Sequence, residues 1–132
     1  MDLYSRTVLV VEDEPLIRMM LADALEDAGY RVLEAGSVLE AVGVISRSNI
    51  DALITDIDMP GGLSGLDLVR MMGSKSRTIP VIIASGGQSL GKAELPGKSL
   101  FFAKPYDVKK MIETLGTMIG GGSEAARFRI AS

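Results

Sequence analysis

The stretch Thr7-Val8-Leu9-Val10-Val11, followed at once by Glu12-Asp13-Glu14-Pro15, decides the fold of this chain. A continuous run of apolar and β-branched residues is typical of a strand that helices cover on both faces, because such a strand has no side that faces solvent. Pro15 suits the first turn of a helix, where a missing backbone N–H costs nothing. We therefore predict a buried strand over Thr7–Val11, acidic side chains at its carboxyl end, and a helix that starts at Pro15.

The same alternation of a short apolar run and a helical segment repeats along the rest of the chain. The further strands are expected over Tyr30–Glu34, Ala52–Thr55, Pro80–Ala84 and Leu100–Ala103. Apolar residues at three- and four-residue spacing predict helices after Pro15, after the N-cap residue Ser37, over Leu66–Met72 and over Val108–Ile119. The segment 86–97 contains four Gly and one Pro, so any helix there should be short or frayed. This order predicts an α/β fold with a parallel sheet.

Length and composition are those of one globular domain. The chain has 132 residues, of which 47% are hydrophobic and 23% are charged. We expect a lead-in over 1–6, the domain over 7–119 and a Gly-rich flexible tail over 120–132. No run approaches the roughly 18 apolar residues of a membrane span, and the N-terminus lacks the pattern of a signal peptide. A cytoplasmic protein without membrane contact is expected.

Charge and residue usage exclude several classes of protein. The 14 Lys and Arg against 17 Asp and Glu give a net charge of −3, the wrong sign for direct binding to a nucleic-acid backbone. The chain has no Cys and no His, which removes disulfides, thiolate and imidazole metal ligands, and a phosphohistidine on this chain itself. Its chemistry must come from carboxylates, hydroxyls and amines.

Polar side chains follow the predicted strands where each strand ends. They are Glu12 and Asp13, Asp56 and Asp58, Ser85, and Lys104. Ligands of a parallel α/β sheet bind at the carboxyl ends of its strands, so we expect these side chains to meet. Four carboxylates close to one lysine repel one another, and a hard cation relieves the repulsion. Oxygen ligands combined with an expected phosphate favour magnesium.

Such a site suits phosphoryl transfer to a carboxylate. Asp56 lies on the middle strand and is the central nucleophile, because a metal and a cation can neutralise charge on the transferred oxygens. Glu12 and Asp13 would hold the metal, while Ser85 and Lys104 would each take a phosphoryl oxygen. The acceptor oxygens of a phosphorylated Asp56 would draw Ser85 toward them. Such a movement on phosphorylation would act as a conformational switch.

The span from Thr7 to Ile119 resembles the receiver domain of two-component response regulators, of the stand-alone, CheY-like kind. The residues that carry the resemblance are Glu12-Asp13, Asp56 with Met59-Pro60 and Gly65, Ser85-Gly86, and Lys104-Pro105. The resemblance implies a flavodoxin-like doubly wound sheet of five parallel strands in the order 2-1-3-4-5. It implies Asp56 as the phosphoacceptor and Mg²⁺ as the cofactor. The implied metal ligands are Glu12, Asp13, Asp56 and the backbone carbonyl of Asp58.

The resemblance also implies roles around the metal. Ser85 is similar to the family's switch hydroxyl, Lys104 to its phosphate-binding lysine, and Phe101 to its switch aromatic residue. A cis peptide bond between Lys104 and Pro105 is implied as well. The implied phosphodonor is a sensor histidine kinase or a histidine phosphotransfer protein. The implied output is altered binding of a downstream protein target, without turnover of a substrate.

Some features depart from the family pattern. Glu12 stands where Asp is commoner, and the loop with Gly61-Gly62 is one residue longer than usual before Gly65. Phe101 lacks the hydroxyl of the frequent Tyr, so its coupling to Ser85 would be steric, and ordinary core packing is an alternative role. The methionine pairs Met19-Met20 and Met71-Met72 are expected to fill gaps in the core.

Two other functions stay open. Asp56-Ile57-Asp58 after an apolar strand also resembles the nucleophile motif of haloacid-dehalogenase-type phosphatases, in which the second Asp acts as general acid. Glu12-Asp13 precedes this motif, however, whereas that family places its second acidic motif after the nucleophile, and 132 residues leave no room for a cap domain. The other alternative is a receiver-shaped interaction module that is never phosphorylated.

Overall fold

The structure is a computed structural model that describes residues 5–59, 62–73, 79–86 and 99–120. Strands and helices alternate along most of this length, as the sequence predicts. In chain order the elements are β1 (Thr7–Val11), α1 (Pro15–Asp27), β2 (Arg31–Ala35), α2 (Val38–Arg47), β3 (Ala52–Asp56), α3 (Gly65–Gly73), β4 (Val81–Ser85), β5 (Ser99–Ala103) and α4 (Val108–Gly120).

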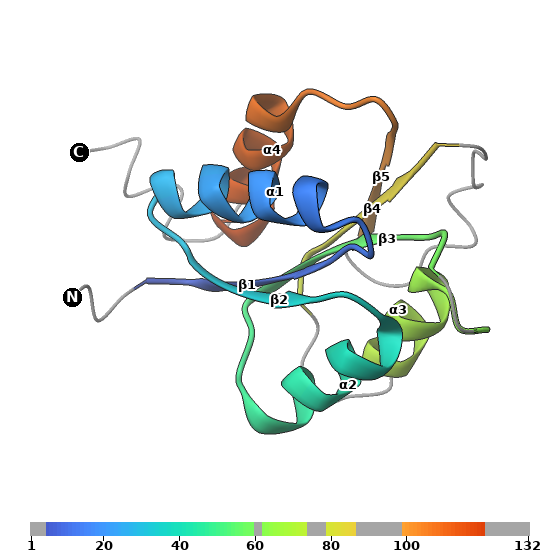
Figure 1. The fold of residues 1–132 in the computed structure, drawn as a ribbon. Coiled ribbons are helices and arrows are strands. Elements are labelled where there is room, and N and C mark those ends of the chain that lie inside the picture. Colours follow the sequence, from blue (N-terminus) through green and yellow to red (C-terminus); the bar gives the residue numbers. More distant parts are fainter. Residues whose placement is uncertain (1–4, 60–61, 74–78, 87–98, 121–132) are drawn as a thin grey trace.

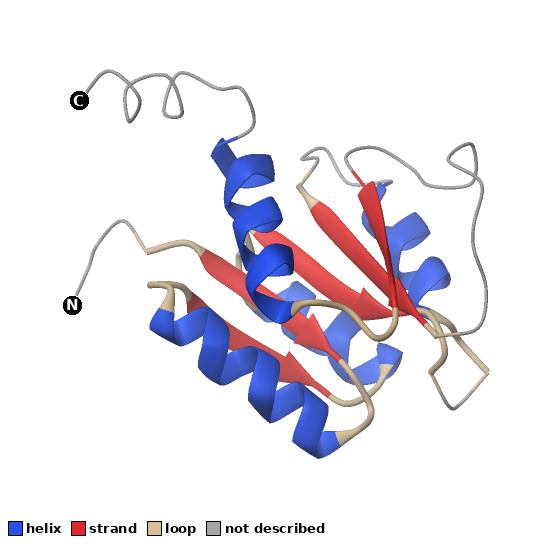
Figure 2. Cartoon of the chain, turned by 90° about the horizontal axis from the view of Figure 1, so that it is seen from above, coloured by secondary structure: helices blue, strands red, loops and turns tan. Residues whose placement is uncertain are grey.

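The five strands form one parallel sheet in the order β2-β1-β3-β4-β5, which confirms the predicted doubly wound topology. The order reverses at β1, which lies between β2 and β3 and pairs with both: Leu9 faces Leu33 on one side and Leu53 on the other. In Figure 2 the arrowheads of the strands gather at one edge of the sheet, where residues that follow each strand are brought together.

Helices cover both faces of the sheet. In Figure 1, α1 and α4 lie on one face, and α2 and α3 lie on the other. The continuous apolar run of β1 contributes side chains to the cores on both faces of the sheet, because alternate side chains point to opposite faces. Val8 and Val10 pack with Leu21 of α1 in one core, whereas Leu9 and Val11 belong to the core under α2 and α3.

Helix capping agrees with the sequence at two places. Pro15 occupies the start of α1, and Ser37 caps α2 by accepting a hydrogen bond from the Glu40 amide at 3.1 Å. None of the helices within the described residues is long and apolar enough to cross a membrane.

Several strand boundaries differ from the prediction by one residue, and β2 and β4 are each shifted by one residue toward the C-terminus. β2 begins at Arg31 because the Tyr30 amide donates to the Leu25 carbonyl at 3.1 Å and so helps to close the end of α1. β4 begins at Val81 because Pro80 has no N–H to donate, although its carbonyl accepts from the Leu53 amide at 3.0 Å. β5 starts one residue early, at Ser99. The predicted short helix over 86–97 falls almost wholly outside the described residues, as does the tail from residue 121 on.

The expectation that the methionine pairs fill the core is wrong for three of the four residues. Met19 and Met20 are each 50% exposed, and Met71 is 41% exposed, while Met72 packs against the core. The buried stripe of α1 runs through Leu21, Ala22 and Leu25, so Met19 and Met20 project beyond the edge that the sheet can cover.

Candidate functional site

The ends of four neighbouring strands bring the predicted site residues together. Glu12 follows β1, Asp56 ends β3, Ser85 ends β4 and Lys104 follows β5. Glu12, Asp56 and Ser85 are buried, with 3%, 6% and 1% of their surface exposed, whereas Asp13 is exposed. Buried carboxylates are rare unless they are paired, so this group of side chains is unusual for a structural role alone.

The carboxylates of Glu12, Asp13 and Asp56 form one cluster. Each can offer an oxygen atom that lies within 4.8 Å of those of the other two. Lys104 reaches into the cluster: its Nζ donates to Asp56 Oδ2 at 2.7 Å and to Glu12 Oε1 at 3.5 Å. The lysine therefore supplies the positive charge that the two buried carboxylates require.

Asp56 is held from several directions. Its Oδ1 accepts a hydrogen bond from the Asp58 amide at 3.1 Å, and its backbone carbonyl accepts one from the Thr55 hydroxyl at 3.0 Å. Gly65, the first residue of α3, donates its amide to the Ile57 carbonyl at 3.1 Å. A Cβ atom at Gly65 would overlap the carbonyl oxygen of Asp56 and would lie 2.9 Å from Thr55 Oγ1. The close approach of α3 to the end of β3 therefore requires glycine at this position.

Hydrogen bonds to backbone groups hold the loop that carries Glu12 and Asp13. The Glu12 amide donates to the Ala35 carbonyl at 3.0 Å, and Glu12 Oε2 accepts from the Glu14 amide at 3.1 Å. Arg18 Nη1 donates to the Glu12 carbonyl at 2.8 Å. Sequence reasoning missed Arg18, because on the helical pattern of α1 it occupies a position that faces away from the apolar stripe.

Burial and charge shift the pKa values of Glu12, Lys104 and Tyr106. Burial raises the pKa of Glu12, and the charge of Asp56 adds to this, against the Glu14 amide and Lys104. Burial by itself lowers the pKa of Lys104, but the hydrogen bond and charge of Asp56, with the charge of Glu12, more than offset it and raise the pKa. Burial and the charge of Glu12 raise the pKa of Tyr106, against Lys104. The lysine therefore stays protonated beside Asp56 at neutral pH.

The remaining predicted site residues are Ser85, Asp58 and Phe101. The Ser85 hydroxyl donates to Asp58 Oδ2 at 3.4 Å, and the Ser85 carbonyl accepts from the Lys104 amide at 2.9 Å. Phe101 is half-buried and packs against the core under α2 and α3. The peptide bond between Lys104 and Pro105 is cis.

The donor set suits a hard divalent cation. Three carboxylates offer oxygen atoms to one point, without nitrogen or sulfur ligands, and oxygen donors of this kind are those that Mg²⁺ prefers. The negative charge of these carboxylates exceeds the single charge of Lys104, so a bound divalent cation would lower their mutual repulsion.

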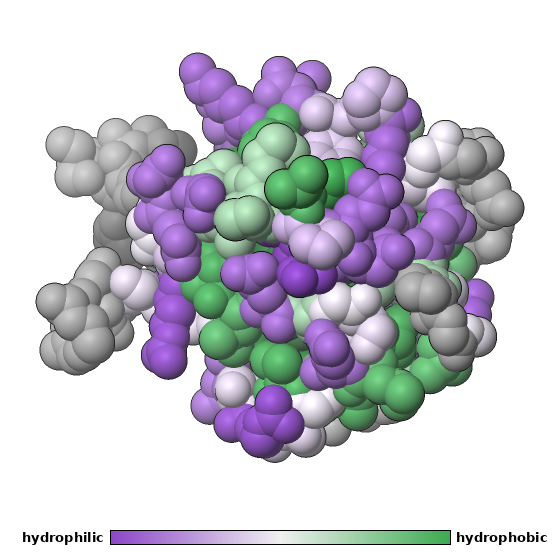
Figure 3. Space-filling view, in the orientation of Figure 1, coloured by the Kyte–Doolittle hydropathy of each residue, from purple (hydrophilic) through white to green (hydrophobic). Residues whose placement is uncertain are grey.

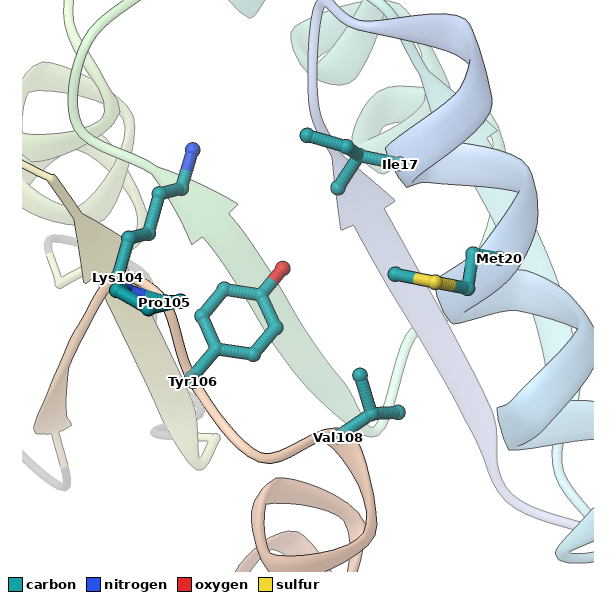
Figure 4. Close-up of a pocket in the computed structure, with 6 residues that line it drawn as sticks. All are labelled: Ile17, Met20, Lys104, Pro105, Tyr106 and Val108. Carbon is teal, nitrogen blue, oxygen red and sulfur yellow. The ribbon is translucent and has the colours of Figure 1, made fainter.

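An apolar groove of about 350 Å³ lies beside Lys104. Figure 4 shows Ile17 and Met20 of α1 pointing across it toward Tyr106; the remaining lining residues are Lys104, Pro105 and Val108. Met20 is exposed, as are two further apolar residues of the same helix, Leu16 and Met19. Apolar patches interrupt the polar surface over α1 in Figure 3.

The chain matches proteins of known families along most of its length. Residues 8–116 match the model of the response regulator receiver domain. The chain is 35% identical over 109 residues to the CAI-1 autoinducer sensor kinase/phosphatase CqsS of Vibrio cholerae, a match that covers 79% of this chain and 16% of CqsS. It is 29% identical over 121 residues to the polar-differentiation response regulator DivK of Brucella ovis, covering 88% of this chain and 98% of DivK. The chain thus spans about a sixth of the length of CqsS but nearly all of DivK.

Solved structures of receiver domains are similar to the whole fold. The receiver domain of the hybrid histidine kinase CckA aligns with a TM-score of 0.73 and 32% identity, covering 86% of this chain and 98% of that domain. The response regulator TrrA of Thermotoga maritima, solved in complex with Mg²⁺-BeF, aligns with a TM-score of 0.74 and 26% identity, covering 86% and 98%. Together with the sheet order and the clustered strand-end residues, these matches place the chain in the response regulator receiver domain family of two-component signalling.

Proposed function

We propose that this chain accepts a phosphoryl group on Asp56 from a phosphohistidine of another protein and thereby changes its surface for a downstream protein target. The observation that carries the proposal is the Asp56 carboxylate, which is 6% exposed and accepts a hydrogen bond from Lys104 Nζ at 2.7 Å within the Glu12, Asp13 and Asp56 cluster. An aspartate that served only the fold would not need two further carboxylates beside it, since they repel it.

The proposed cofactor is Mg²⁺. Glu12, Asp13 and Asp56 would hold it with their side chains, and Asp58 would add its backbone carbonyl. When bound, the ion neutralises negative charge on the oxygens of the transferred group. The solved complex of TrrA with Mg²⁺-BeF supports this choice of ion.

In the proposed step, a carboxylate oxygen of Asp56 attacks the phosphorus atom of the donor. A P–O bond to Asp56 forms as the P–N bond to the donor's imidazole breaks, and the leaving nitrogen takes a proton from solvent. Lys104, already 2.7 Å from Asp56, would bind one oxygen of the transferred group. No His of this chain can be the donor, because the sequence has none.

Ser85 is proposed to report phosphorylation. Its hydroxyl donates to Asp58 Oδ2 at 3.4 Å, a long contact that a phosphoryl oxygen on Asp56 can replace with a stronger, charge-assisted one. Phe101 has no hydroxyl with which to follow Ser85, so any part that it plays in the switch would be through packing alone. Movement of Ser85 would alter the end of β4, where the Ser85 carbonyl accepts from the Lys104 amide, and with it the surface presented to the target.

The phosphodonor is proposed to be a sensor histidine kinase or a histidine phosphotransfer protein. The matches to CqsS, a sensor kinase, and to the receiver domain of the hybrid histidine kinase CckA support this class. The groove between α1 and Tyr106 is where the donor would dock, because it is apolar, partly walled by the exposed Met20, and bordered by Lys104 of the acceptor site. The proposed receiver unit is 7–119, with 1–6 and 120–132 outside it.

The test is labelling with a small phosphodonor. We expect the wild-type chain, incubated with Mg²⁺ and acetyl phosphate, to gain about 80 Da, the mass of one phosphoryl group, on Asp56. Asp56→Asn keeps the shape of the side chain and removes the nucleophile, so it should gain nothing. EDTA should abolish labelling of the wild type.

The same assay distinguishes the alternatives. An adduct that accumulates and then decays slowly fits a receiver, whereas steady release of phosphate from small phosphate esters would fit a phosphatase of the haloacid-dehalogenase kind. A chain that binds Mg²⁺ and yet is labelled neither by acetyl phosphate nor by any histidine donor would be an unphosphorylated interaction module. Labelling that persists in Asp56→Asn would show that Asp56 is not the acceptor.

A further inference from the structure

The guanidinium group of Arg18 joins three segments beside the acidic cluster. Its Nη1 donates to the backbone carbonyl of Glu12 at 2.8 Å, and its Nε donates to Glu34 Oε1 at 3.2 Å. Arg18 lies near the start of α1, Glu34 lies on β2, and Glu12 lies in the loop between β1 and α1. The Arg18 side chain is only 23% exposed, so it is packed between these segments and differs from a freely solvated surface arginine.

The contact with the Glu12 carbonyl fixes the peptide bond between Glu12 and Asp13. A peptide group is planar, so an anchor on its oxygen also fixes the direction in which the Asp13 Cα leaves it. On the other side of Glu12, the amide is anchored by the Ala35 carbonyl at 3.0 Å. Arg18 therefore supplies the anchor on the side of Asp13, the exposed member of the acidic cluster.

We propose that Arg18 is a positioning residue for Mg²⁺ binding, which acts by orienting the backbone that carries Asp13 and Glu12. The inference rests on the proposed function, because it takes Mg²⁺ as the ion at the acidic cluster. Without the anchor, the Asp13 carboxylate samples more orientations, and ordering it on ion binding costs conformational entropy. Groups that orient metal ligands in this way commonly affect affinity although they do not touch the metal.

The charge of Arg18 by itself predicts the opposite effect on Mg²⁺ affinity. A guanidinium cation beside an acidic cluster weakens the attraction of the cluster for Mg²⁺, so its removal would tighten binding if charge were the whole effect. Loss of positioning weakens binding instead. Lysine retains the charge but not the planar group of several donors, and it cannot hold the Glu12 carbonyl and the Glu34 carboxylate in the same fixed geometry.

The experiment measures Mg²⁺ binding directly, by titration calorimetry on the full chain. We expect Arg18→Ala to raise the dissociation constant about tenfold and Arg18→Lys to raise it less. Arg31→Ala is the matched control for loss of one positive charge: Arg31 is exposed and lies at the opposite end of β2 from Ala35, so its loss should leave the constant unchanged or slightly lower. In acetyl phosphate labelling, Arg18→Ala should need more Mg²⁺ for half-maximal rate but reach the wild-type rate at saturation.

Several outcomes overturn the inference. An unchanged or lower dissociation constant in Arg18→Ala does so, and a lower melting temperature without a change in Mg²⁺ affinity would make Arg18 purely structural. Should Arg18→Ala fail to fold, Glu34→Ala removes the acceptor of the Arg18 Nε hydrogen bond, one of the two anchors on the arginine, and should weaken Mg²⁺ binding modestly. Unchanged affinity in both Glu34→Ala and Arg18→Lys would then refute the positioning role. A wild type that binds no Mg²⁺ refutes the proposed function itself, whereas equal binding by wild type and Arg18→Ala refutes only this inference.

Discussion

Lys104 Nζ lies 2.7 Å from Asp56 Oδ2, across 48 residues of sequence, and 3.5 Å from Glu12 Oε1, across 92. One lysine thus serves two nearly buried carboxylates that come from the ends of two neighbouring strands. Without a metal ion, this lysine is the cation that offsets their repulsion. The stability of the protein and the readiness of its acceptor site are therefore linked through Lys104.

Removal of the Lys104 ammonium group should make the stability of the protein depend on Mg²⁺. In EDTA we expect Lys104→Ala to lower the free energy of unfolding by about 1–2 kcal/mol, less than for a fully buried pair because the lysine side chain is 25% exposed. Saturating Mg²⁺ should restore most of the loss, because the ion neutralises the same carboxylates. Urea denaturation with EDTA and with Mg²⁺ measures both quantities. Equal stabilisation of wild type and variant by Mg²⁺ would contradict the proposed link between Lys104, stability and the acceptor site.

The same variant tests the role of Lys104 in signalling. Asp56 keeps its carboxylate in Lys104→Ala, so we expect the chain to fold and still to be labelled by acetyl phosphate. The phosphorylated variant should fail to gain affinity for its downstream target, because the contact between Lys104 and the phosphoryl group is missing. Co-purification of phosphorylated wild type and variant with target proteins measures this. A normal gain in target binding would limit Lys104 to a structural role.

The raised pKa of Glu12 predicts a dependence of stability on pH. Burial and the charge of Asp56 favour the neutral carboxyl in the folded state. The contribution of this group to stability is therefore fully present below its ordinary pKa of 4.5 and is lost as the pH rises through the raised folded value. In EDTA, Glu12→Gln should be more stable than the wild type at neutral pH, and the difference should shrink as the pH falls toward 4.5. Urea denaturation across this range measures it, with Glu26→Gln on the exposed side of α1 as the control for net charge. A Glu12→Gln variant that is less stable at neutral pH would show that the hydrogen bond with the Glu14 amide outweighs burial.

Gly65 should be essential to the position of Asp56. A methyl group at Gly65 would overlap the Asp56 carbonyl, so Gly65→Ala must push α3 away from the end of β3. We expect a loss of about 1–3 kcal/mol in the free energy of unfolding, together with slower labelling of Asp56. Gly116→Ala is the control: it lies inside α4, where the nearest atom to an added Cβ is Tyr30 Oη at 3.4 Å, and alanine should stabilise the helix by up to about 1 kcal/mol. Similar stability in both alanine variants would refute the steric argument.

The groove beside Lys104 should matter for phosphoryl transfer from a protein donor and not for transfer from a small donor such as acetyl phosphate. Met20→Glu places a charge on its apolar wall, and we expect phosphoryl transfer from a histidine kinase or phosphotransfer protein that labels the wild type to fall about tenfold. Labelling by acetyl phosphate, which needs no docking surface, should not change. Leu39→Glu introduces the same charge at an exposed apolar residue of α2, on the other face of the sheet, and should affect neither reaction. An equal loss in both variants would indicate an effect of charge and not of docking.

Local patterns in the sequence were sufficient to predict the order of the elements and the gathering of polar side chains at one edge of the sheet. The continuous apolar run of β1 indicates burial on both faces, and a strand buried on both faces requires a layer of helices on each side. Because parallel strands share one carboxyl edge, the positions of Glu12, Asp56, Ser85 and Lys104 along the chain implied that they meet. The described structure places them together at that edge.

The exact strand boundaries, the exposure of helix residues and the contacts between segments were decided by the tertiary structure alone. β2 begins at Arg31 and not Tyr30 because hydrogen bonds already commit the Tyr30 amide to the end of α1. The helical period of α1 could not distinguish Met20, which is half exposed, from Leu21, which is buried, since the extent of the apolar face depends on what packs against it. The link from Arg18 to the Glu12 carbonyl has no sequence signature, because any arginine on a polar helix face gives the same pattern. Which polar side chains share the carboxyl edge of the sheet follows from strand order, but how firmly each is held depends on hydrogen bonds between segments that only the folded chain brings within reach.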